Sequence, residues 1–309
     1  MRIIISEFMD DAAVASLKAS FDVTYEQDLV DRPAALEGLL ADADALIVRN
    51  RTQVNAALLA AAPLLRVVGR LGVGLDNIDT AACADRRIAV IPATGANALA
   101  VAEYVVGTAM LLLRGAYQST DAVGAGTWPR TPLSNGREIA GKTLGLIGFG
   151  GIGRLTATLA RGLRMRVIAF DPQVPASAPL WGEHGTLCVT LGAVIAQSDV
   201  LSLHVPLADA TRNLIGATQL AQMKPNAILI NTARGGVVDE AAVAAALRAG
   251  SLGGAALDVF DHEPLPAGSP LAGCPNLLLT PHIAGLTRES NVRVSSMVAD
   301  AVAAALRTP

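Results

Sequence analysis

The chain has 309 residues, of which 52% are hydrophobic, and its 24 Lys and Arg against 27 Asp and Glu give a formal net charge of −3. This length suffices for two domains with a large core, and the balanced charge argues against a nucleic-acid or membrane-surface partner. The three cysteines fit neither a metal cluster nor a disulfide framework and favour a reducing, cytoplasmic compartment, and no stretch is suitable for a signal sequence or a bilayer span.

The first part of the chain, up to about residue 96, alternates short apolar runs with helical patterns. Strands are predicted at 3–5, 45–48, 66–69 and 88–91, and helices at 10–18, 33–40 and 55–61. This alternation is typical of βα units around a parallel sheet. We therefore predict a separate α/β domain that has no phosphate-binding glycines of its own.

A long apolar helix is predicted at 97–113, and its composition predicts burial on nearly all sides. The helix can pack partly against another subunit or be buried within the monomer, and the sequence leaves both possibilities open. The following stretch, 123–137, is rich in Gly, Pro, Thr and Ser. It predicts an extended arm or loop, with Trp128 as its anchor.

The central motif lies at 143–155, where a short apolar strand runs into Gly148, Gly150 and Gly153. These glycines fit the pattern G-x-G-x-x-G, in which they allow a tight turn, close approach of a pyrophosphate, and close packing of the next helix on the sheet. The N–H groups and positive dipole end of that helix would face the phosphates. The motif therefore predicts a dinucleotide site, the alternative being a turn without a ligand.

Asp171 ends the next apolar run, at the position where an acidic residue binds both ribose hydroxyls of a dinucleotide. Its carboxylate would repel the 2′-phosphate of NADP, so the sequence favours NAD. Further strands are predicted at 187–189, 200–203, 227–230, 255–257 and 277–279, and a helix at 288–306. They predict a doubly wound sheet of six or seven strands, and the helix at 288–306 could return to the first domain.

Three ionisable residues, Arg234, Glu263 and His282, follow strand ends in this second half. An Arg binds a carboxylate through two parallel hydrogen bonds, a His transfers a proton near neutral pH, and a neighbouring Glu fixes the tautomer of the imidazole. Beside a nicotinamide they suit hydride transfer to a 2-keto acid. Each one alone could instead be a solvated loop charge, a cap or a satisfied buried histidine. His204, which ends a strand, is expected to line the nicotinamide side rather than to transfer a proton.

The chain resembles the D-isomer-specific 2-hydroxyacid dehydrogenases over nearly its whole length. The motifs that carry this resemblance are GRLGVGLDNID at 69–79, LGLIGFGGIGRL at 144–155, HVPL at 204–207, INTARGGVVD at 230–239, LDVFDHEPL at 257–265 and TPHIAG at 280–285. The resemblance implies an α/β fold of two Rossmann-like, doubly wound domains, with the active site in the cleft between them. A flavodoxin-like substrate domain would comprise 1–96 and 288–309, and an NAD-binding domain, 97–287, would form homodimers.

The same resemblance implies roles for particular residues. Arg234, Glu263 and His282 would be catalytic, while Asp258 and the backbone of Ala233 would hold the nicotinamide end. The expected NAD-binding residues are Gly148, Gly150, Gly151, Ile152, Gly153, Asp171, His204, Val205, Pro206, Thr211, Thr232, Ala233, Arg234, Asp258, His282 and Gly285. The expected substrate-binding residues are Arg49, Asn50, Arg51, Val73, Gly74, Arg234 and His282, with the backbone of Val73 and Gly74 on the substrate carboxylate.

The choice of substrate depends on the arginines after the strand at 45–48. Many family members carry a single arginine where Arg49 stands, so Arg51 is an addition, and clustered arginines suit a substrate with a second anionic group. The stretches 5–10, 47–52 and 114–120 look like the sulfolactate dehydrogenase branch. Alternatively, these arginines are surface charges paired with carboxylates.

We therefore predict an NAD-dependent dehydrogenase for a small 2-hydroxy or 2-keto acid of the sulfolactate or 3-phosphoglycerate type. A glycerate or hydroxypyruvate reductase is the alternative enzyme. A non-catalytic, NAD-sensing protein like the corepressors related to this family is the alternative from another class.

Overall fold

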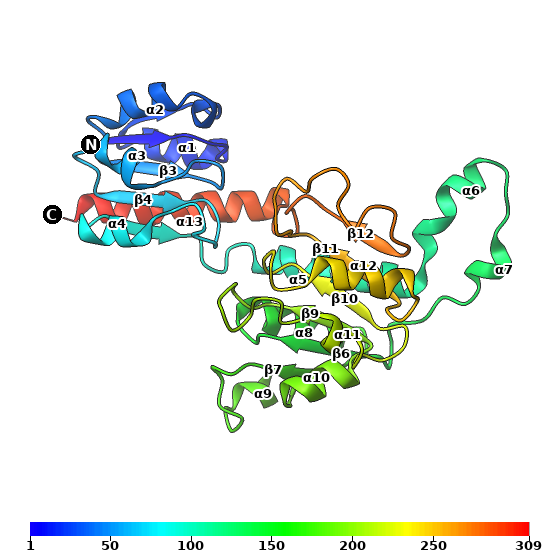
Figure 1. The fold of residues 1–309 in the computed structure, drawn as a ribbon. Coiled ribbons are helices and arrows are strands. Elements are labelled where there is room, and N and C mark those ends of the chain that lie inside the picture. The colour runs from blue at the N-terminus through cyan, green and yellow to red at the C-terminus, as the bar shows by residue number, and fades with distance from the viewer. Residues whose placement is uncertain (309) are drawn as a thin grey trace. The chain divides into compact units, whose positions relative to one another are not determined.

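A computed structural model of the chain describes residues 1–308, apart from the side chain of Ala116. The chain divides into two compact units, one of Met1–Asn97 with Leu286–Pro309 and the other of Ala98–Gly285 (Figure 1). The boundaries expected from the sequence were 96/97 and 287/288. The first unit is therefore discontinuous, and the second is inserted into it.

The first unit contains a five-stranded parallel sheet in the order β2-β1-β3-β4-β5. Its strands are β1 (Arg2–Ile5), β2 (Asp22–Tyr25), β3 (Ala45–Val48), β4 (Val67–Arg70) and β5 (Ala89–Pro92). This is the strand order of flavodoxin-like folds, as predicted. Strand β2 was not predicted, because it lies at the sheet edge and its sequence, Asp-Val-Thr-Tyr, lacks the apolar run of a buried strand.

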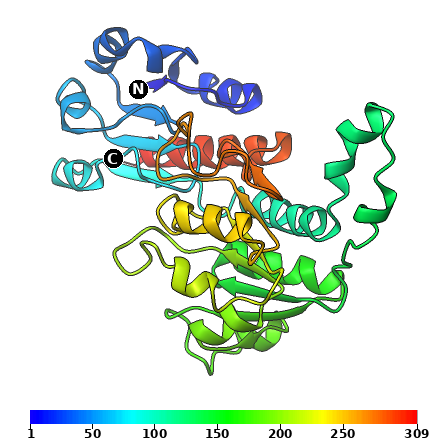
Figure 2. The same ribbon diagram turned by 45° about the vertical axis from the view of Figure 1, so that its right-hand side comes forward.

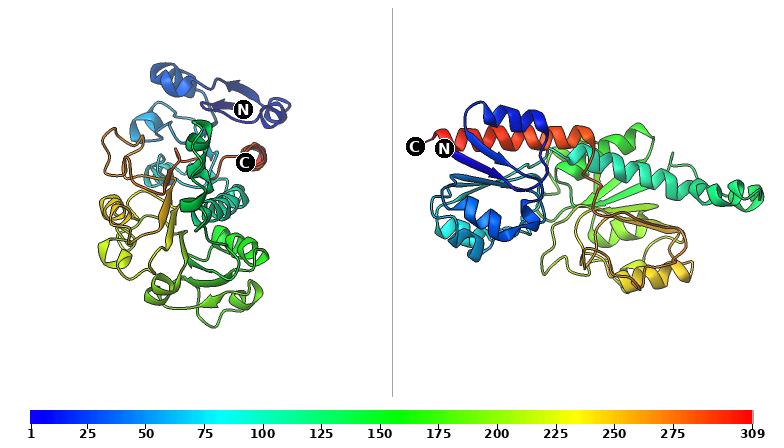
Figure 3. Two further views of the ribbon diagram at one scale, coloured as in Figure 1. Left: turned by 90° about the vertical axis from the view of Figure 1, so that its right-hand side faces the viewer. Right: turned by 90° about the horizontal axis from the view of Figure 1, so that it is seen from above.

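Helices cover both faces of this sheet. They are α1 (Asp11–Lys18), α2 (Pro33–Leu40), α3 (Ala56–Ala60), α4 (Thr80–Asp85) and α13 (Arg288–Arg307), with a 3₁₀ turn, η1, at Leu29–Asp31. Ile3 and Ile5 pack in one buried cluster with α1 and α13, whereas Ile4, between them, packs on the other face with α2, α3 and α4. Helix α13, red in Figure 3, thus completes the core of the first unit.

The second unit contains a seven-stranded parallel sheet in the order β12-β11-β10-β9-β6-β7-β8. Its strands are β6 (Thr143–Ile147), β7 (Arg166–Phe170), β8 (Leu187–Cys188), β9 (Val200–Leu203), β10 (Ile228–Asn231), β11 (Gly254–Leu257) and β12 (Leu277–Leu279). Numbered within the unit, this is the Rossmann order 3-2-1-4-5-6 with a seventh strand added at one edge. The predicted pair of doubly wound domains is confirmed.

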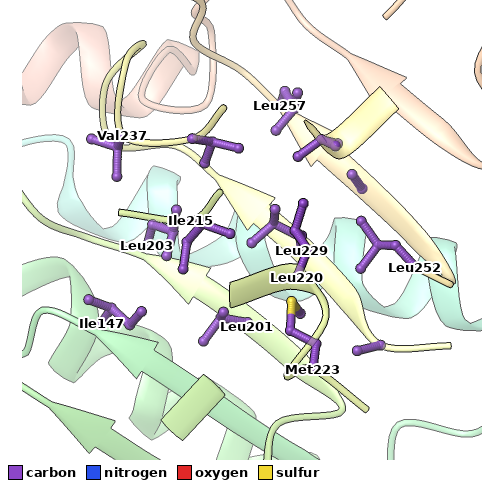
Figure 4. Packing of buried hydrophobic residues seen from close by; sticks show 14 of the residues in the cluster. Ile147, Leu201, Leu203, Ile215, Leu220, Met223, Leu229, Val237, Leu252 and Leu257 are labelled. Atoms are coloured by element: carbon purple, nitrogen blue, oxygen red, sulfur yellow. The ribbon is translucent and has the colours of Figure 1, made fainter. Parts of the chain in front are cut away.

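Alternate residues of these strands face two layers of helices. The helices are α5 (Ala98–Arg114), α6 (Thr120–Gly124), α7 (Arg130–Leu133), α8 (Gly151–Gly162), α9 (Leu180–Glu183), α10 (Leu191–Gln197), α11 (Ala217–Leu220) and α12 (Glu240–Arg248), with a 3₁₀ turn, η2, at Ala116–Ser119. Leu229 packs toward α10, α11 and α12, in the cluster that Figure 4 shows, whereas Ile228 and Ile230 pack toward α5 and α8. The sheet is therefore buried on both faces, as parallel sheets are.

The segment after the first domain is only partly covered within one chain. Helix α5 has an exposed stripe there, on which Leu99, Met110 and Leu111 are 37–45% exposed, so of the two alternatives burial within its own chain is not complete. The expected arm contains the short helices α6 and α7, which stand away from the sheet of their unit (Figure 2), and Trp128 between them is 75% exposed, so it anchors nothing within the described chain. Pro129 explains α7, since its fixed φ suits the start of a helix.

Within the described residues, no single helix has both the length and the apolarity needed to cross a membrane. The helical segments Ala98–Arg114 and Tyr117–Gly124, which are bent relative to each other, are long and apolar enough only when they are counted together.

Candidate functional site

Three candidate catalytic residues follow three neighbouring strands of the second sheet. Arg234 comes after β10, Glu263 after β11 and His282 after β12, and these strands pair in that order. In a parallel sheet the carboxyl ends of all strands lie at one edge, which is where doubly wound proteins bind their ligands. The sheet therefore places the three side chains in adjacent loops at its ligand-binding edge.

Glu263 and His282 are in direct contact. His282 Nδ1 lies 2.8 Å from Glu263 Oε2, and Glu263 Oε1 accepts a hydrogen bond of 3.1 Å from the backbone N–H of Phe260. An ionised carboxylate only accepts hydrogen bonds, so the proton between the two side chains belongs on Nδ1 of the imidazole. Nε2 is then the atom of His282 that exchanges a proton with a substrate.

The backbone of His282 adopts an unusual conformation, with φ of 56°. A non-glycine residue in this left-handed region is strained and needs support from its surroundings. Here the N–H of His282 donates to the carbonyl of Asp258 at 2.8 Å. The Asp258 carboxylate accepts from the N–H groups of Ile283 and Ala284, both at 2.8 Å. Asp258 was expected to hold the nicotinamide end, and in this structure both of its oxygens bind the loop that carries His282.

A chain of hydroxyl groups extends this support into α5. Thr280 Oγ1 donates to Asp258 Oδ1 at 2.6 Å, and the Tyr104 hydroxyl lies 2.6 Å from Thr280 Oγ1. Since the Thr280 proton is directed to the carboxylate, the Tyr104 hydroxyl is the donor to Thr280. Burial raises the pKa of Tyr104, so the phenol keeps this proton at neutral pH. The sequence analysis did not identify Tyr104, because a tyrosine within an apolar helix is expected to be an ordinary residue of the hydrophobic core.

The loop that carries Arg234 is closed by Asn231 at the end of β10. Asn231 Oδ1 accepts from the N–H of Ala233 at 3.0 Å, and its Nδ2 donates to the carbonyl of Arg234 at 3.0 Å. Arg234 Nη1 also donates to the carbonyl of Ala233 at 2.6 Å. The buried Asn231, 2% exposed, was not among the predicted residues and fixes the turn that presents the arginine.

The glycine motif forms a cradle that fits a dinucleotide. Gly148 has φ of 95°, and a Cβ on it would meet the carbonyl oxygen of His204 at 2.3 Å, so only glycine fits there. A Cβ on Gly150 or Gly151 would meet no atom within 4 Å, and no side chain caps the N-terminus of α8. The start of α8, which also carries Ile152 and Gly153, is therefore open to a pyrophosphate.

Other predicted cofactor residues lie along the same edge. Asp171 follows β7, and its carboxylate accepts from the N–H groups of Phe149 at 2.7 Å and Gln173 at 2.8 Å. Among the described residues the buried hydroxyl of Thr232, after β10, has no hydrogen-bond partner, which suits a polar group of a ligand. The remaining members lie in the loops after β9 and β12: Val205, Pro206, Thr211 and Gly285.

His204 is unsuited to proton transfer at neutral pH. Burial lowers the pKa of His204 to about 4. Its Nε2 lies 3.0 Å from the hydroxyl of Ser202 on β9. The imidazole is therefore neutral at pH 7 and can line a nicotinamide without adding a charge.

The predicted substrate residues of the first unit follow β3 and β4, which are paired neighbours. Val73 and Gly74 lie in the loop after β4, where Val73 is 39% exposed. Arg49, Asn50 and Arg51 lie in the loop after β3. The structure thus places both predicted groups at the carboxyl edge of the first sheet.

Arg49 and Arg51 differ in how their charges are compensated. The two terminal guanidinium nitrogens of Arg51 bind the carboxylate of Asp31, with Nη1 at 3.2 Å from Oδ2. This is the surface pairing that the sequence left open as an alternative. The Arg49 guanidinium instead donates to Asn291 Oδ1 at 2.8 Å and lies 5.5 Å from the centre of the Phe8 ring. Both of these contacts are uncharged. Burial lowers the pKa of Arg49, and the nearby charge of Glu7 partly opposes this shift.

Comparison with known proteins gives a family match across the second unit. Residues 106–284 match the model of the D-isomer specific 2-hydroxyacid dehydrogenase, NAD binding domain. The (S)-sulfolactate dehydrogenase of Chromohalobacter salexigens is 54% identical over 304 residues, which are 98% of each chain. A D-3-phosphoglycerate dehydrogenase of Archaeoglobus fulgidus is 40% identical over 83% of this chain. That match covers 48% of the relative, so the chain spans about half of its length.

Solved structures agree in fold over the full length. A crystal structure of a D-lactate dehydrogenase from Aquifex aeolicus, complexed with NAD and lactic acid, superposes with a TM-score of 0.84 at 28% identity. The match covers 99% of this chain and 96% of that one.

Proposed function

The chain belongs to the D-isomer specific 2-hydroxyacid dehydrogenases and is an NAD-dependent oxidoreductase, and from this we propose that it oxidises, reversibly, a 2-hydroxy acid that carries a sulfonate on C3. The observation that carries the substrate assignment is the 54% identity, over 98% of both chains, to an (S)-sulfolactate dehydrogenase. The presence of Arg49, whose guanidinium contacts, Asn291 and Phe8, are both uncharged, supports a substrate with a second anion.

Each residue of the site has a chemical task in this reaction. His282 Nε2 takes the proton of the C2 hydroxyl, because Nδ1 is already bound to Glu263. The Glu263 carboxylate stabilises the imidazolium that results, and the loop held by Asp258 keeps the ring in place. Arg234 binds the substrate carboxylate through its planar guanidinium. The glycine cradle and Asp171 would hold NAD, which when bound would supply the hydride-acceptor chemistry.

A substrate panel tests the assignment. With NAD in excess, steady-state rates are measured for both enantiomers of sulfolactate, 3-phosphoglycerate, glycerate and lactate, by absorbance of the reduced nicotinamide. We expect kcat/KM for one sulfolactate enantiomer to exceed that for lactate by about 100-fold, since desolvated charge pairs contribute a few kcal/mol. Equal values for lactate or glycerate would refute the second-anion assignment, and a higher value for 3-phosphoglycerate would replace sulfonate by phosphate.

We also propose that the protein forms a homodimer through its second unit and acts in the cytoplasm. Exposed apolar side chains on α5 and the segment that follows it, Leu99, Met110, Leu111, Val123 and Trp128, support such a contact. Exposed apolar side chains of this size are often buried in protein interfaces. The three free cysteines support a reducing compartment.

A further inference from the structure

Glu7 is a buried acidic residue that the mechanism above does not use. It is the second residue after β1 and is 4% exposed. Its Oε1 accepts from the N–H groups of Arg49 at 2.9 Å and Thr52 at 3.0 Å. Its Oε2 accepts from the N–H groups of Asn50 at 3.3 Å and Arg51 at 3.1 Å. All four N–H groups of the Arg49–Thr52 loop therefore converge on one carboxylate.

Successive backbone N–H groups that point to one place form an anion-binding nest. In this loop the protein's own carboxylate fills the nest. Burial raises the pKa of Glu7, but the hydrogen bonds from Thr52, Arg49 and Arg51 together lower this pKa by more than burial raises it. The net shift is therefore downward, and the carboxyl group is ionised at neutral pH. The N–H groups of the loop are thus already engaged, and a substrate anion has to bind to its side chains.

The carbonyl side of the loop is held as well. Asn77, which is 8% exposed, donates through Nδ2 to the carbonyl of Thr52 at 2.7 Å and approaches that of Arg49 at 3.4 Å. The hydroxyls of Ser6 and Thr52 lie 2.9 Å apart. Glu7 and Asn77 therefore hold opposite sides of one loop, from which the Arg49 guanidinium extends to Asn291 and Phe8.

We propose that Glu7 is a positioning residue, which fixes the Arg49–Thr52 loop and thereby sets where the Arg49 guanidinium meets the second anion of the substrate. The inference rests on the proposed function, because it requires Arg49 to bind that anion. Without the carboxylate, four N–H groups lose their common acceptor and the loop samples other conformations. The cost then falls on binding of the dianionic substrate rather than on hydride transfer, because Glu7 binds the loop that carries Arg49 and not the groups assigned to C2.

The test compares Glu7→Gln with a matched control, Asp44→Asn. The Asp44 carboxylate also accepts from a backbone N–H, that of Arg2 at 2.7 Å, but at the opposite end of the same two strands. In Glu7→Gln one acceptor oxygen becomes an amide donor that faces N–H groups. We expect KM for sulfolactate to rise about 10-fold, in line with the loss of hydrogen bonds to a charged group. KM for NAD and kcat stay within about twofold, and Glu7→Asp, which keeps the charge on a shorter side chain, recovers part of the loss. Asp44→Asn leaves KM for sulfolactate unchanged.

Two outcomes overturn the inference: an unchanged KM for sulfolactate in Glu7→Gln, or the same kinetic change in Asp44→Asn at a similar loss of melting temperature. If Glu7→Gln does not fold, Glu7→Asp carries the test, and an unchanged KM there overturns the inference equally. Arg49→Met separates this failure from failure of the proposed function. If Arg49→Met affects sulfolactate and lactate alike, the second-anion assignment fails. If it affects sulfolactate selectively while Glu7→Gln has no effect, only the role of Glu7 fails.

Discussion

His282 Nδ1 and Glu263 Oε2 lie 2.8 Å apart, although the two residues come from loops after different strands. The contact depends on the pairing of β11 with β12 and on the left-handed backbone of His282 at φ 56°. Asp258 supports that backbone through three donors, the N–H groups of Ile283 and Ala284 and the hydroxyl of Thr280. The proton-transfer pair is therefore a property of two adjacent loops, and it can be tested without disturbing the sheet.

Replacing His282 by Asn removes the imidazole but keeps a residue type that tolerates a left-handed backbone. We expect His282→Asn to lower kcat by about 1,000-fold, within the range for loss of general acid–base catalysis. The affinity for NAD, measured by nicotinamide fluorescence, should stay the same. The matched control is His262→Asn, next to Glu263, which should retain full activity. A kcat above a tenth of the wild-type value in His282→Asn would exclude His282 as the proton carrier.

Replacing Asp171 by Asn removes a negative charge but keeps an acceptor for the N–H of Phe149, which Asp171 Oδ2 binds at 2.7 Å. The loss of charge relieves repulsion of a 2′-phosphate, so we expect KM for NADP to fall about 10-fold. The ratio of kcat/KM for NAD to that for NADP is the measurement. If this ratio does not change, another group determines cofactor choice.

The two arginines of the Arg49–Thr52 loop should respond differently to removal. Arg51 is paired with Asp31 at the surface, with side chains 58% and 55% exposed, and exposed ion pairs contribute little. We therefore expect Arg51→Ala to change KM for sulfolactate by less than about threefold and Arg49→Met to raise it by about 10-fold or more. Lactate serves as the reference substrate for both variants. A larger effect in Arg51→Ala would mean that Arg51 leaves Asp31 to bind the substrate.

The buried Glu7 carboxylate should make stability depend on pH. Its pKa is lower in the folded chain than in the unfolded chain, so its contribution is fully present above the unfolded value and is lost as the pH falls through the folded value. We expect the difference in melting temperature between the wild type and Glu7→Gln to be constant between pH 6 and 8 and to shrink below about pH 4.5. A difference that grows on acidification would show the opposite sign of shift.

The exposed stripe of α5 and Trp128 should contribute to dimer formation. Combining Met110→Ser with Trp128→Ser removes two side chains that are 45% and 75% exposed, so the fold of the monomer should keep its melting temperature. We expect the mass measured by size exclusion with light scattering to move from dimer toward monomer. If the wild-type protein is monomeric at all concentrations, the proposed dimer does not exist. If the double variant remains a dimer, the contact lies elsewhere on the surface.

Much of the fold can be read from local patterns in the sequence. Buried parallel strands such as β3 and β10 are apolar runs, broken in β10 only by its last residue, Asn231. Of the glycines after β6, Gly148 has a conformation that only glycine adopts easily. The site residues could be located because parallel strands bring their carboxyl ends to one edge. The same reasoning could have found Glu7, an acid two residues after the apolar run of β1.

Other features depend on contacts that no local pattern records. Strand β2 is defined by pairing with β1, since its own residues are polar or only half-buried. The composition of α5 predicts burial on nearly all sides but not by what, and within one chain packing on the second sheet and on α8 covers only part of it. Tyr104 acts through a hydroxyl that reaches Thr280, 176 residues further along the chain. Tertiary contacts, not propensity, decide such features.

The insertion of residues 98–285 between the two segments of the first unit has a consequence for biosynthesis. One face of the first sheet is shared by α1 and α13, and the part that α13 covers stays exposed while the nascent chain is shorter than about 300 residues. Gly69 on β4 lies in that part, since Val298 and Val302 of α13 would contact any Cβ there at 2.8 Å. At ribosomal rates of about 5–20 residues per second, this part of the apolar face stays uncovered for tens of seconds. The inserted unit, continuous in sequence, can fold on the ribosome first, and the earliest part of the polypeptide to emerge is then the last to mature.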